Sequence, residues 1–440
     1  MSKSYYEKFK SKSYYEKFKS KSYYEKFKFN HKKLNINTIR NDFPILSKKI
    51  NNNNLIWFDN GATTQKPLIM INKIKSYYSN FNANVHRSPH YLSKISSLMF
   101  DNVREITKKY INANSSDEII FTRGTTEGIN LLANTIGKQK LSNGGTILLS
   151  NMEHHANIVP WQLAKEMYKF ELDYIFFNKE TGNIDLVELE NKLITNKTIK
   201  IVSITHVSNI LGVINHIKKI SEIVHKYNAI LIIDGAQGIP HIKINVKDID
   251  CDFYVFSSHK LFGPTSVGIV YGKKYLLDDM QPYQGGGSMI KNVTLYSSTF
   301  QNAPLKFEAG TPSIAEIIGF GQTLEYLNQY NWDDIYDYEH KLMVYLFNKL
   351  IKINKLVLLS NEIINRVPVF SFVLNISDPQ KFLEYLDSNG IAIRYGHHCS
   401  QPTLSHLGYE NVFRVSLAFY NTFDEIDIFI QKMIYYISKL

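Results

Sequence analysis

The sequence of 440 residues contains only two cysteines, Cys251 and Cys399, and they form no CxxC pair. This scarcity argues against a disulfide framework and against a zinc or iron–sulfur site held by several cysteines, and it suits a reducing compartment. The chain also lacks an apolar run of about 18 residues, so we expect no transmembrane helix. We expect no secretory signal, because lysine interrupts every apolar stretch near the start.

The excess of basic over acidic residues is concentrated in the first residues of the chain. The nonapeptide Ser-Lys-Ser-Tyr-Tyr-Glu-Lys-Phe-Lys occurs three times between residues 2 and 28, and residues 1–33 carry 11 Lys against three Glu. Of the total net charge of +11, residues 34–440 therefore carry only +3. We interpret residues 1–33 as a basic tandem-repeat tail and expect no nucleic-acid partner, although a tail that binds nucleic acid stays open as an alternative.

From about residue 117, short β-branched or aromatic runs alternate with longer amphipathic runs. This pattern predicts strands near 118–121, 146–150, 173–177, 199–204, 229–233 and 252–256, with helices at 126–137, 160–169, 185–194 and 217–227. Such alternation is typical of an α/β fold with a mainly parallel sheet, in which ligands bind beyond the carboxyl ends of the strands. The residues that directly follow each strand are therefore the candidates for a functional site.

The pattern changes beyond residue 310, where long helices and separate strands follow one another. We interpret residues 59–310 as a large domain and residues 311–440 as a smaller C-terminal α+β domain. Residues 34–58 are predicted to form an N-terminal segment that packs with the small domain. This segment ends in an apolar strand at Leu55–Phe58.

A lysine follows the last of the predicted strands in the large domain. The run Phe256-Ser257-Ser258-His259-Lys260 leaves a buried strand and presents a hydroxyl, an imidazole and an amine. A lysine in this position can hold an aldehyde cofactor as a Schiff base, with Ser257 and His259 reaching a phosphate. The alternative is an ordinary solvated loop lysine.

Two other strand ends carry polar groups that suit the same kind of cofactor. After the strand at 118–121, the hydroxyls of Thr125 and Thr126 and the first amides of a helix can hold a phosphate, or these residues only cap the helix. Asp234 follows the strand at 229–233 and can pair with a protonated pyridine nitrogen, or it is a turn or cap residue.

A pair of adjacent histidines follows the strand at 146–150. His154 can stack on a cofactor ring and move protons near neutral pH. His154 next to His155 also suggests a metal site, but the chain has no HExxH motif and no spaced carboxylate cluster, so we expect no metal.

The second cysteine lies in a polar loop of the small domain, within the run 394–402. Histidine and arginine neighbours favour the thiolate form of Cys399, and Arg394 can bind a substrate carboxylate through a two-point fork. The alternative is a surface thiol. We interpret Cys251, at the start of an apolar strand, as structural.

Taken in order, these stretches resemble the cysteine desulfurases of the class V aminotransferase family, specifically their Suf-type branch, from about residue 42 onward. The resembling segments are Asp59–Pro67, Asn84–Arg87, Arg123–Asn130, Glu153–Trp161, Thr205–Asn209, Asp234–Gln237, Ser257–Pro264, Phe307–Pro312 and Arg394–Pro402.

The resemblance implies a fold-type I enzyme that uses pyridoxal 5'-phosphate (PLP), forms a homodimer and converts L-cysteine to L-alanine with a persulfide on Cys399. It implies that Lys260, His154 and Cys399 are catalytic and that Asn209, Arg394 and Arg414 bind the substrate. The cofactor-binding residues would be Thr125, Thr126, His154, Asn209, Asp234, Gln237, Ser257, His259, Lys260 and, toward the neighbouring subunit, Thr311.

The short loop around Cys399 resembles that of the Suf-type branch, whose thiol cannot travel far. The resemblance therefore implies a separate sulfur-acceptor protein that feeds iron–sulfur cluster assembly. A selenocysteine lyase of the same fold is an alternative, whereas a catalytically idle scaffold would be expected to lack Lys260 or Cys399. We expect a bacterial cytoplasmic protein, with a plastid location as the alternative.

Overall fold

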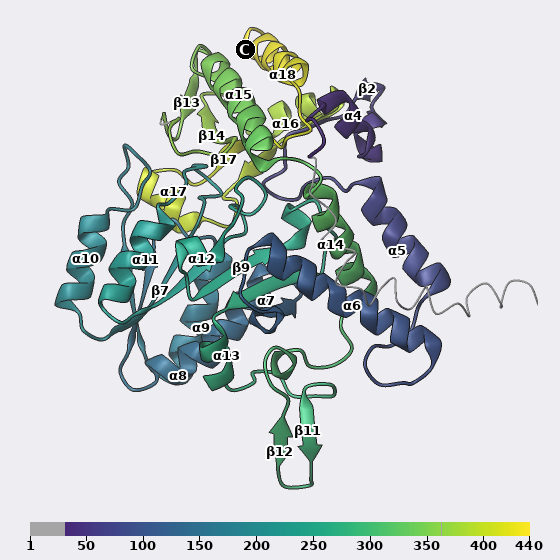
Figure 1. The fold of residues 1–440 in the computed structure, drawn as a ribbon. Coiled ribbons are helices and arrows are strands. Elements are labelled where there is room, and N and C mark those ends of the chain that lie inside the picture. The colour runs from purple at the N-terminus through teal and green to yellow at the C-terminus, as the bar shows by residue number, and fades with distance from the viewer. Residues whose placement is uncertain (1–30, 362) are drawn as a thin grey trace, which may run out of the picture.

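The computed structural model describes residues 31–361 and 363–440, which form a large α/β domain with a smaller α+β domain packed above it (Figure 1). The predicted tandem repeats at 2–28 lie outside the described residues. The fold class predicted from the sequence is confirmed.

A seven-stranded sheet forms the centre of the large domain. Its strands, in spatial order, are β4 (Ile119–Thr122), β10 (Gly268–Gly272), β9 (Phe253–Ser257), β8 (Ile230–Asp234), β7 (Ile199–Thr205), β5 (Thr146–Ser150) and β6 (Glu171–Ile175). Only β10 runs antiparallel to its neighbours β4 and β9, so the sheet is mainly parallel, as predicted. Strand β10, a short apolar run bounded by two glycines, was not predicted from the sequence.

Apolar side chains point alternately to the two faces of this sheet. Ile147 and Leu149 belong to the core on one face, whereas Leu148 belongs to the core on the other. Because successive side chains of a strand point in opposite directions, a buried parallel strand must be apolar on both sides. One face is covered by α7 (Thr125–Leu132), α8 (Lys138–Leu141), α9 (Val159–Tyr168) and α13 (Lys274–Asp279). The other is covered by α6 (Tyr91–Tyr110), α10 (Leu186–Thr195), α11 (Ile217–Lys226), α12 (Val246–Ile249) and α14 (Ile314–Leu327).

The small domain has an antiparallel sheet and its own apolar core. The strands, in spatial order, are β13 (Leu356–Leu358), β14 (Val369–Leu374), β17 (Val412–Ser416) and β16 (Arg394–Gly396). The helices that contribute to its core are α15 (Trp332–Leu350), α16 (Pro379–Ser388) and α18 (Phe423–Ile437). Helix α14 instead packs on α6 and on α5 (Leu68–Asn80) of the large domain. The packing therefore favours a domain boundary after α14, later than the predicted residue 311.

The N-terminal segment contacts both domains. Its strand β3 (Ile56–Trp57) pairs in parallel with β15 (Ile391–Ala392), and Phe58 is buried in the small-domain core. Upstream lie α4 (Ile36–Asn41), the 3₁₀ turn η1 (Pro44–Ser47) and a hairpin of β1 (Lys49–Ile50) and β2 (Asn53–Asn54). Phe43 packs 6.0 Å from the ring of Phe262, next to the Lys260 loop. This segment therefore links the small domain to the region of the predicted site.

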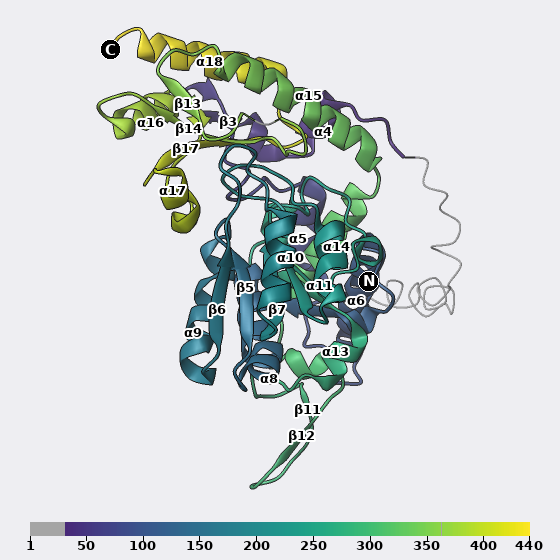
Figure 2. The ribbon, with the colours of Figure 1, turned by 90° about the vertical axis from the view of Figure 1, so that its left-hand side faces the viewer.

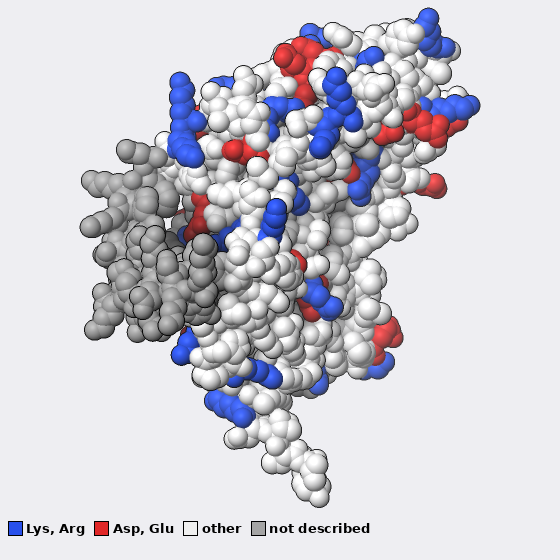
Figure 3. Space-filling model, turned by 90° about the vertical axis from the view of Figure 1, so that its right-hand side faces the viewer, with Lys and Arg blue, Asp and Glu red and all other residues white. Residues whose placement is uncertain are grey.

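A hairpin of β11 (Ile290–Val293) and β12 (Ser298–Phe300) projects from the end of the large domain opposite the small domain (Figures 1 and 2). The face drawn in Figure 3 carries Lys and Arg interspersed with Asp and Glu, so no single sign of charge dominates what is described there. Among residues 31–361 and 363–440, no helix combines the length and apolar character needed to cross a bilayer.

Candidate active site

A cavity of about 410 Å³ lies between the two domains, at the carboxyl ends of the large-domain strands. It brings together every site residue predicted from the sequence except Thr311, which is exposed and accepts a hydrogen bond from Asn84 Nδ2 at 3.4 Å. The lining residues are Gly61, Ala62, Thr63, Thr125, Thr126, His154, Ala156, Thr205, Asn209, Asp234, Ala236, Gln237, Ser257, His259, Lys260, Thr265, Arg394, His398, Cys399 and Arg414.

Lys260 ends a short 3₁₀ turn, η5 (Ser258–Lys260), that directly follows the buried strand β9. Burial lowers the pKa of its amine to about 8, and the nearby Asp234 only partly opposes this effect. About a tenth of the amine is therefore neutral, and so nucleophilic, at pH 7, far more than for an ordinary lysine. The backbone around it is fixed by Lys66, whose Nζ donates to the carbonyl of His259 at 2.7 Å, and by Thr64, whose hydroxyl accepts from Phe262 N at 2.8 Å.

Hydroxyl groups gather where β4 passes into α7. Thr125 N donates to Ser257 Oγ at 2.8 Å, and the two hydroxyls of these residues also lie 2.8 Å apart. Strand β10 can pass close to this turn because residue 268 is glycine, since a Cβ there would lie only 2.4 Å from Gly124 Cα. Together with the positive end of the α7 dipole, these hydroxyls form a site that suits a phosphate.

Asp234 and His154 lie on the walls between this hydroxyl cluster and the small domain. Asp234 accepts from Ala236 N at 2.9 Å, and burial raises its pKa. A buried carboxylate of this kind is stabilised by a cation, such as a protonated ring nitrogen. Burial and the charge of Lys260 lower the pKa of His154 to about 3, so its imidazole is neutral. Gln237 donates to the carbonyl of Gly61 at 2.6 Å, which ties the cavity wall to the loop that follows β3.

The groups on the large-domain wall fit one type of cofactor. An amine, a hydroxyl and amide cluster, and a buried carboxylate match an aldehyde that also carries a phosphate and a basic ring nitrogen.

Two arginines lie on the small-domain wall, and both contact Asp59. Arg394 donates to Asp59 Oδ2 from Nε at 3.1 Å and from a terminal nitrogen at 2.9 Å, while Arg414 lies 3.4 Å from Oδ1. Arg414 is buried and also donates to the backbone carbonyl of Asn209 at 3.2 Å, whereas its Nε has no partner among the described residues. The pair offers a positively charged site for a substrate carboxylate.

Cys399 is exposed at the mouth of the cavity, in the loop between β16 and α17 (Gln401–Leu407). Both His398 and Cys399 have left-handed backbone angles, with φ of 51° and 55°. The Asn209 side chain holds the loop, donating to the carbonyl of His398 at 3.0 Å and accepting from the Ser400 hydroxyl at 2.9 Å. The other cysteine, Cys251, is fully buried, in agreement with its structural interpretation.

Several residues of the site were not predicted from the sequence. Asp59 was quoted only as part of a resembling segment, although its place directly after a strand marked it as a candidate. Glu153 is buried behind His154, where it accepts from Thr205 N at 3.0 Å and from Asn157 Nδ2 at 2.7 Å, and burial raises its pKa to about 8. Lys66 supports the Lys260 loop, and burial lowers its pKa to about 7. Lys66 and Glu153 also lie in resembling segments, but no local pattern assigns them a role, since the backbone group that each contacts, His259 O or Thr205 N, is distant in the chain.

Comparison with known proteins agrees with this geometry. A model of the aminotransferase class-V family matches residues 56–429. A cysteine desulfurase from Wigglesworthia glossinidia brevipalpis is 44% identical over 401 residues, which cover 91% of this chain and 97% of the relative. The solved cysteine desulfurase CsdA from Escherichia coli has a TM-score of 0.85 and 30% identity, with 93% of this chain and 100% of that chain covered.

Some relatives are longer than this chain. The match to a cysteine desulfurase from Synechococcus elongatus, at 44% identity over 392 residues, covers 89% of this chain but only 62% of the relative.

The chain therefore belongs to the class-V aminotransferase family, with the fold of its PLP-dependent members. Within that family it groups with the cysteine desulfurases, and the resemblance to them predicted from the sequence is confirmed.

Proposed function

We propose that the protein is a cysteine desulfurase that converts L-cysteine to L-alanine and retains the sulfur as a persulfide on Cys399. One observation supports this most directly. The buried amine of Lys260 and the exposed thiol of Cys399 line the same cavity from opposite domains, with two arginines beside the thiol.

The cofactor in this proposal is PLP. Lys260 would hold it covalently through Nζ, Asp234 would face its ring nitrogen, and the hydroxyls of Thr125, Thr126 and Ser257, with His259, would bind its phosphate. When bound, PLP withdraws electrons from the Cα of an amino acid and makes the Cβ–S bond of cysteine labile.

The chain's own residues then carry out the remaining chemistry. Arg394 and Arg414 bind the substrate carboxylate and orient the substrate sulfur toward Cys399. The thiolate of Cys399 attacks that sulfur, so an S–S bond forms while the Cβ–S bond breaks and its electron pair stays with carbon. Neutral His154 and Lys260 move the protons that convert the carbon fragment to L-alanine. Atoms and electrons balance, because L-cysteine and a thiol become L-alanine and a persulfide.

The proposal extends to the partners of the enzyme. The short loop of Cys399, held by Asn209, restricts the travel of the thiol, which favours a Suf-type enzyme that passes sulfur to a separate acceptor protein for iron–sulfur cluster assembly. Thr311 does not line this chain's cavity and is exposed, which suits the proposed contact with the cofactor of a second subunit in a homodimer. A cytoplasmic location fits such a role.

The test is an absorbance spectrum of the purified protein, followed by assay of alanine and sulfide from L-cysteine, for the wild type and Cys399→Ala. We expect a visible cofactor band in both proteins, with alanine formed from L-cysteine only by the wild type. Full activity of Cys399→Ala would contradict the persulfide mechanism, and absence of the band after addition of PLP would contradict the role of Lys260. Faster turnover of L-selenocysteine by Cys399→Ala than of L-cysteine by the wild type would favour the selenocysteine lyase alternative.

A further inference from the structure

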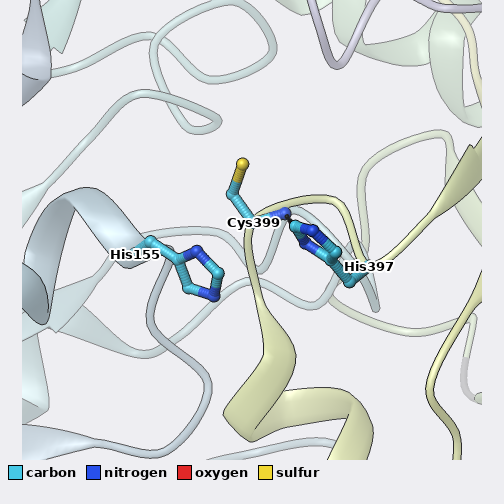
Figure 4. A group of neighbouring side chains, drawn as sticks. All are labelled: His155, His397 and Cys399. Carbon is cyan, nitrogen blue, oxygen red and sulfur yellow. Dashed lines mark hydrogen bonds between the residues drawn. The ribbon is translucent and has the colours of Figure 1, made fainter.

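Two imidazoles flank the exposed thiol at the mouth of the cavity (Figure 4). One nitrogen of His155, one nitrogen of His397 and Cys399 Sγ all lie within 4.8 Å of one another. The two rings are stacked, with centroids 5.6 Å apart and an interplanar angle of 26°. Two histidines and a cysteine at this spacing would usually suggest a site for a soft cation such as zinc.

The hydrogen bonds of the two rings indicate a different role. The backbone N–H of Gln401 donates to Nε2 of His155 at 3.1 Å, and that of Cys399 donates to Nδ1 of His397 at 3.0 Å. A neutral imidazole has only one nitrogen that can accept, so the proton of each ring must sit on the other nitrogen. Partial burial and the neighbouring His397 lower the pKa of His155, which favours its neutral form.

The backbone thus fixes both tautomers. His155 carries its proton on Nδ1 and His397 carries its proton on Nε2. A metal ion needs a nitrogen lone pair, and on each ring that lone pair already accepts a backbone N–H. The nitrogen that is left on each ring is therefore an N–H donor, and an N–H donor suits an anion better than a cation.

We propose that His155 and His397 stabilise the anionic sulfur of Cys399, first as the thiolate and then as the persulfide. The persulfide half of this proposal rests on the proposed function. Both rings have a nitrogen within 4.8 Å of the sulfur, so rotation about the Cα–Cβ bond of Cys399, or one bridging water, is enough to connect the sulfur to a ring N–H. A backbone hydrogen bond keeps the Cys399 loop next to His155, since His155 N donates to the carbonyl of Cys399 at 2.7 Å. His155 therefore binds the loop at two points, the carbonyl of Cys399 and the amide of Gln401.

Other charged groups also act on the sulfur. Lys260 and Arg414 interact electrostatically with Cys399. The remaining titratable residues of the shared cavity are His154, Asp234, His259, Arg394 and His398. Because these groups are unchanged when only His155 or His397 is replaced, comparison of such variants isolates the contribution of the two rings.

The test is the rate at which iodoacetamide alkylates Cys399 of the holoenzyme as a function of pH, without any substrate. Asn at position 155 keeps a donor near the position of Nδ1, whereas Gln keeps only an acceptor for Gln401 N. At position 397 the reverse holds, because Gln reaches the position of Nε2 and Asn replaces the acceptor at Nδ1. Cys399→Ala controls for reaction at the buried Cys251, and the cofactor band shows that each variant is folded.

We expect His155→Asn and His397→Gln to retain the wild-type pH profile. His155→Gln and His397→Asn should react about tenfold more slowly at pH 7, with the midpoint of the profile moved upward by about one pH unit. If His155→Gln and His397→Asn instead react at the wild-type rate while His155→Asn and His397→Gln react slowly, the rings only position the loop through their accepting nitrogens. That result would overturn the proposal. Tight binding of Zn²⁺ to the wild type that is lost on substitution of either His155 or His397 would also overturn it, because the two histidines and Cys399 would then hold a cation. Neither readout depends on desulfurase turnover, so failure here is distinct from failure of the proposed function.

Discussion

The two walls of the cavity differ in how firmly they hold their functional groups. On the large-domain wall, Asp234 and Ser257 are buried at the ends of parallel strands, and the carbonyl before Lys260 accepts three side-chain donors. On the small-domain wall, Cys399 is exposed in a loop and the Arg394 side chain is 49% exposed. The difference indicates that one wall is built to fix a cofactor, while the other is built to meet molecules that arrive and leave.

The strongest test of this comparison is the substitution Lys260→Met on the rigid wall. We expect the cofactor band to vanish and alanine formation to fall by about a thousandfold or more, because no other amine lining the cavity can replace Nζ. The matched control is Lys243→Met. Burial also lowers the pKa of Lys243 to about 8, but its amine lies over the ring of Tyr110, away from the cavity lining. Equal loss in both variants would refute the special position of Lys260.

The packing behind the same wall predicts the next largest effect. In Gly268→Ala, the new Cβ would lie 2.4 Å from Gly124 Cα, so the strands must separate next to the proposed phosphate site. We expect the free energy of unfolding to fall by about 3 kcal/mol in urea denaturation, with weaker retention of the cofactor. Gly285→Ala is the control, since nothing lies within 4 Å of its Cβ position. If Gly268→Ala is as stable as Gly285→Ala, the large-domain wall accommodates the added methyl group and is not rigid.

A smaller effect is expected on the exposed wall. Arg394→Lys keeps the charge but removes the fork that contacts Asp59, so we expect KM for L-cysteine to rise about tenfold with the cofactor band unchanged. The same substitution at Arg123, whose side chain is 72% exposed and outside the cavity lining, should leave KM as in the wild type. A change in the cofactor spectrum of Arg394→Lys would contradict the comparison, because the small-domain wall would then also affect the cofactor.

The rigid wall was the part of the molecule that could be predicted best from the sequence. Asp234, Lys260 and Thr125 each follow a strand directly, and parallel strands bring such residues to one edge whatever the details of packing. The partners of Asp59 could not be predicted in this way, because Arg394 and Arg414 approach it only after the two domains pack together. The same is true of the stacking of His155 on His397, which joins two loops almost 250 residues apart in the chain.

Local patterns also failed where neighbours decide the structure. The strand β10 is only five residues long and contains two glycines, so its propensity is weak, and it forms because β4 and β9 leave an edge between them. The hairpin of β11 and β12 exposes its apolar tip, which includes Leu295 and Tyr296. An exposed apolar tip gives no alternation between buried and exposed faces from which a strand could be predicted.

The path of the N-terminal segment has a consequence for biosynthesis. Phe58 leaves the ribosome long before Ser416, yet its carbonyl accepts from Ser416 N at 2.8 Å, and Ile56 N donates to the carbonyl of Gly390 at 2.9 Å. The large-domain sheet is complete once β10 has been made, whereas β3 finds its partner only when β15 (Ile391–Ala392) has been made. Until then Ile56 and Phe58 lack these partners on the growing chain, and Cys399, which follows β15, reaches its place only after this pairing is possible.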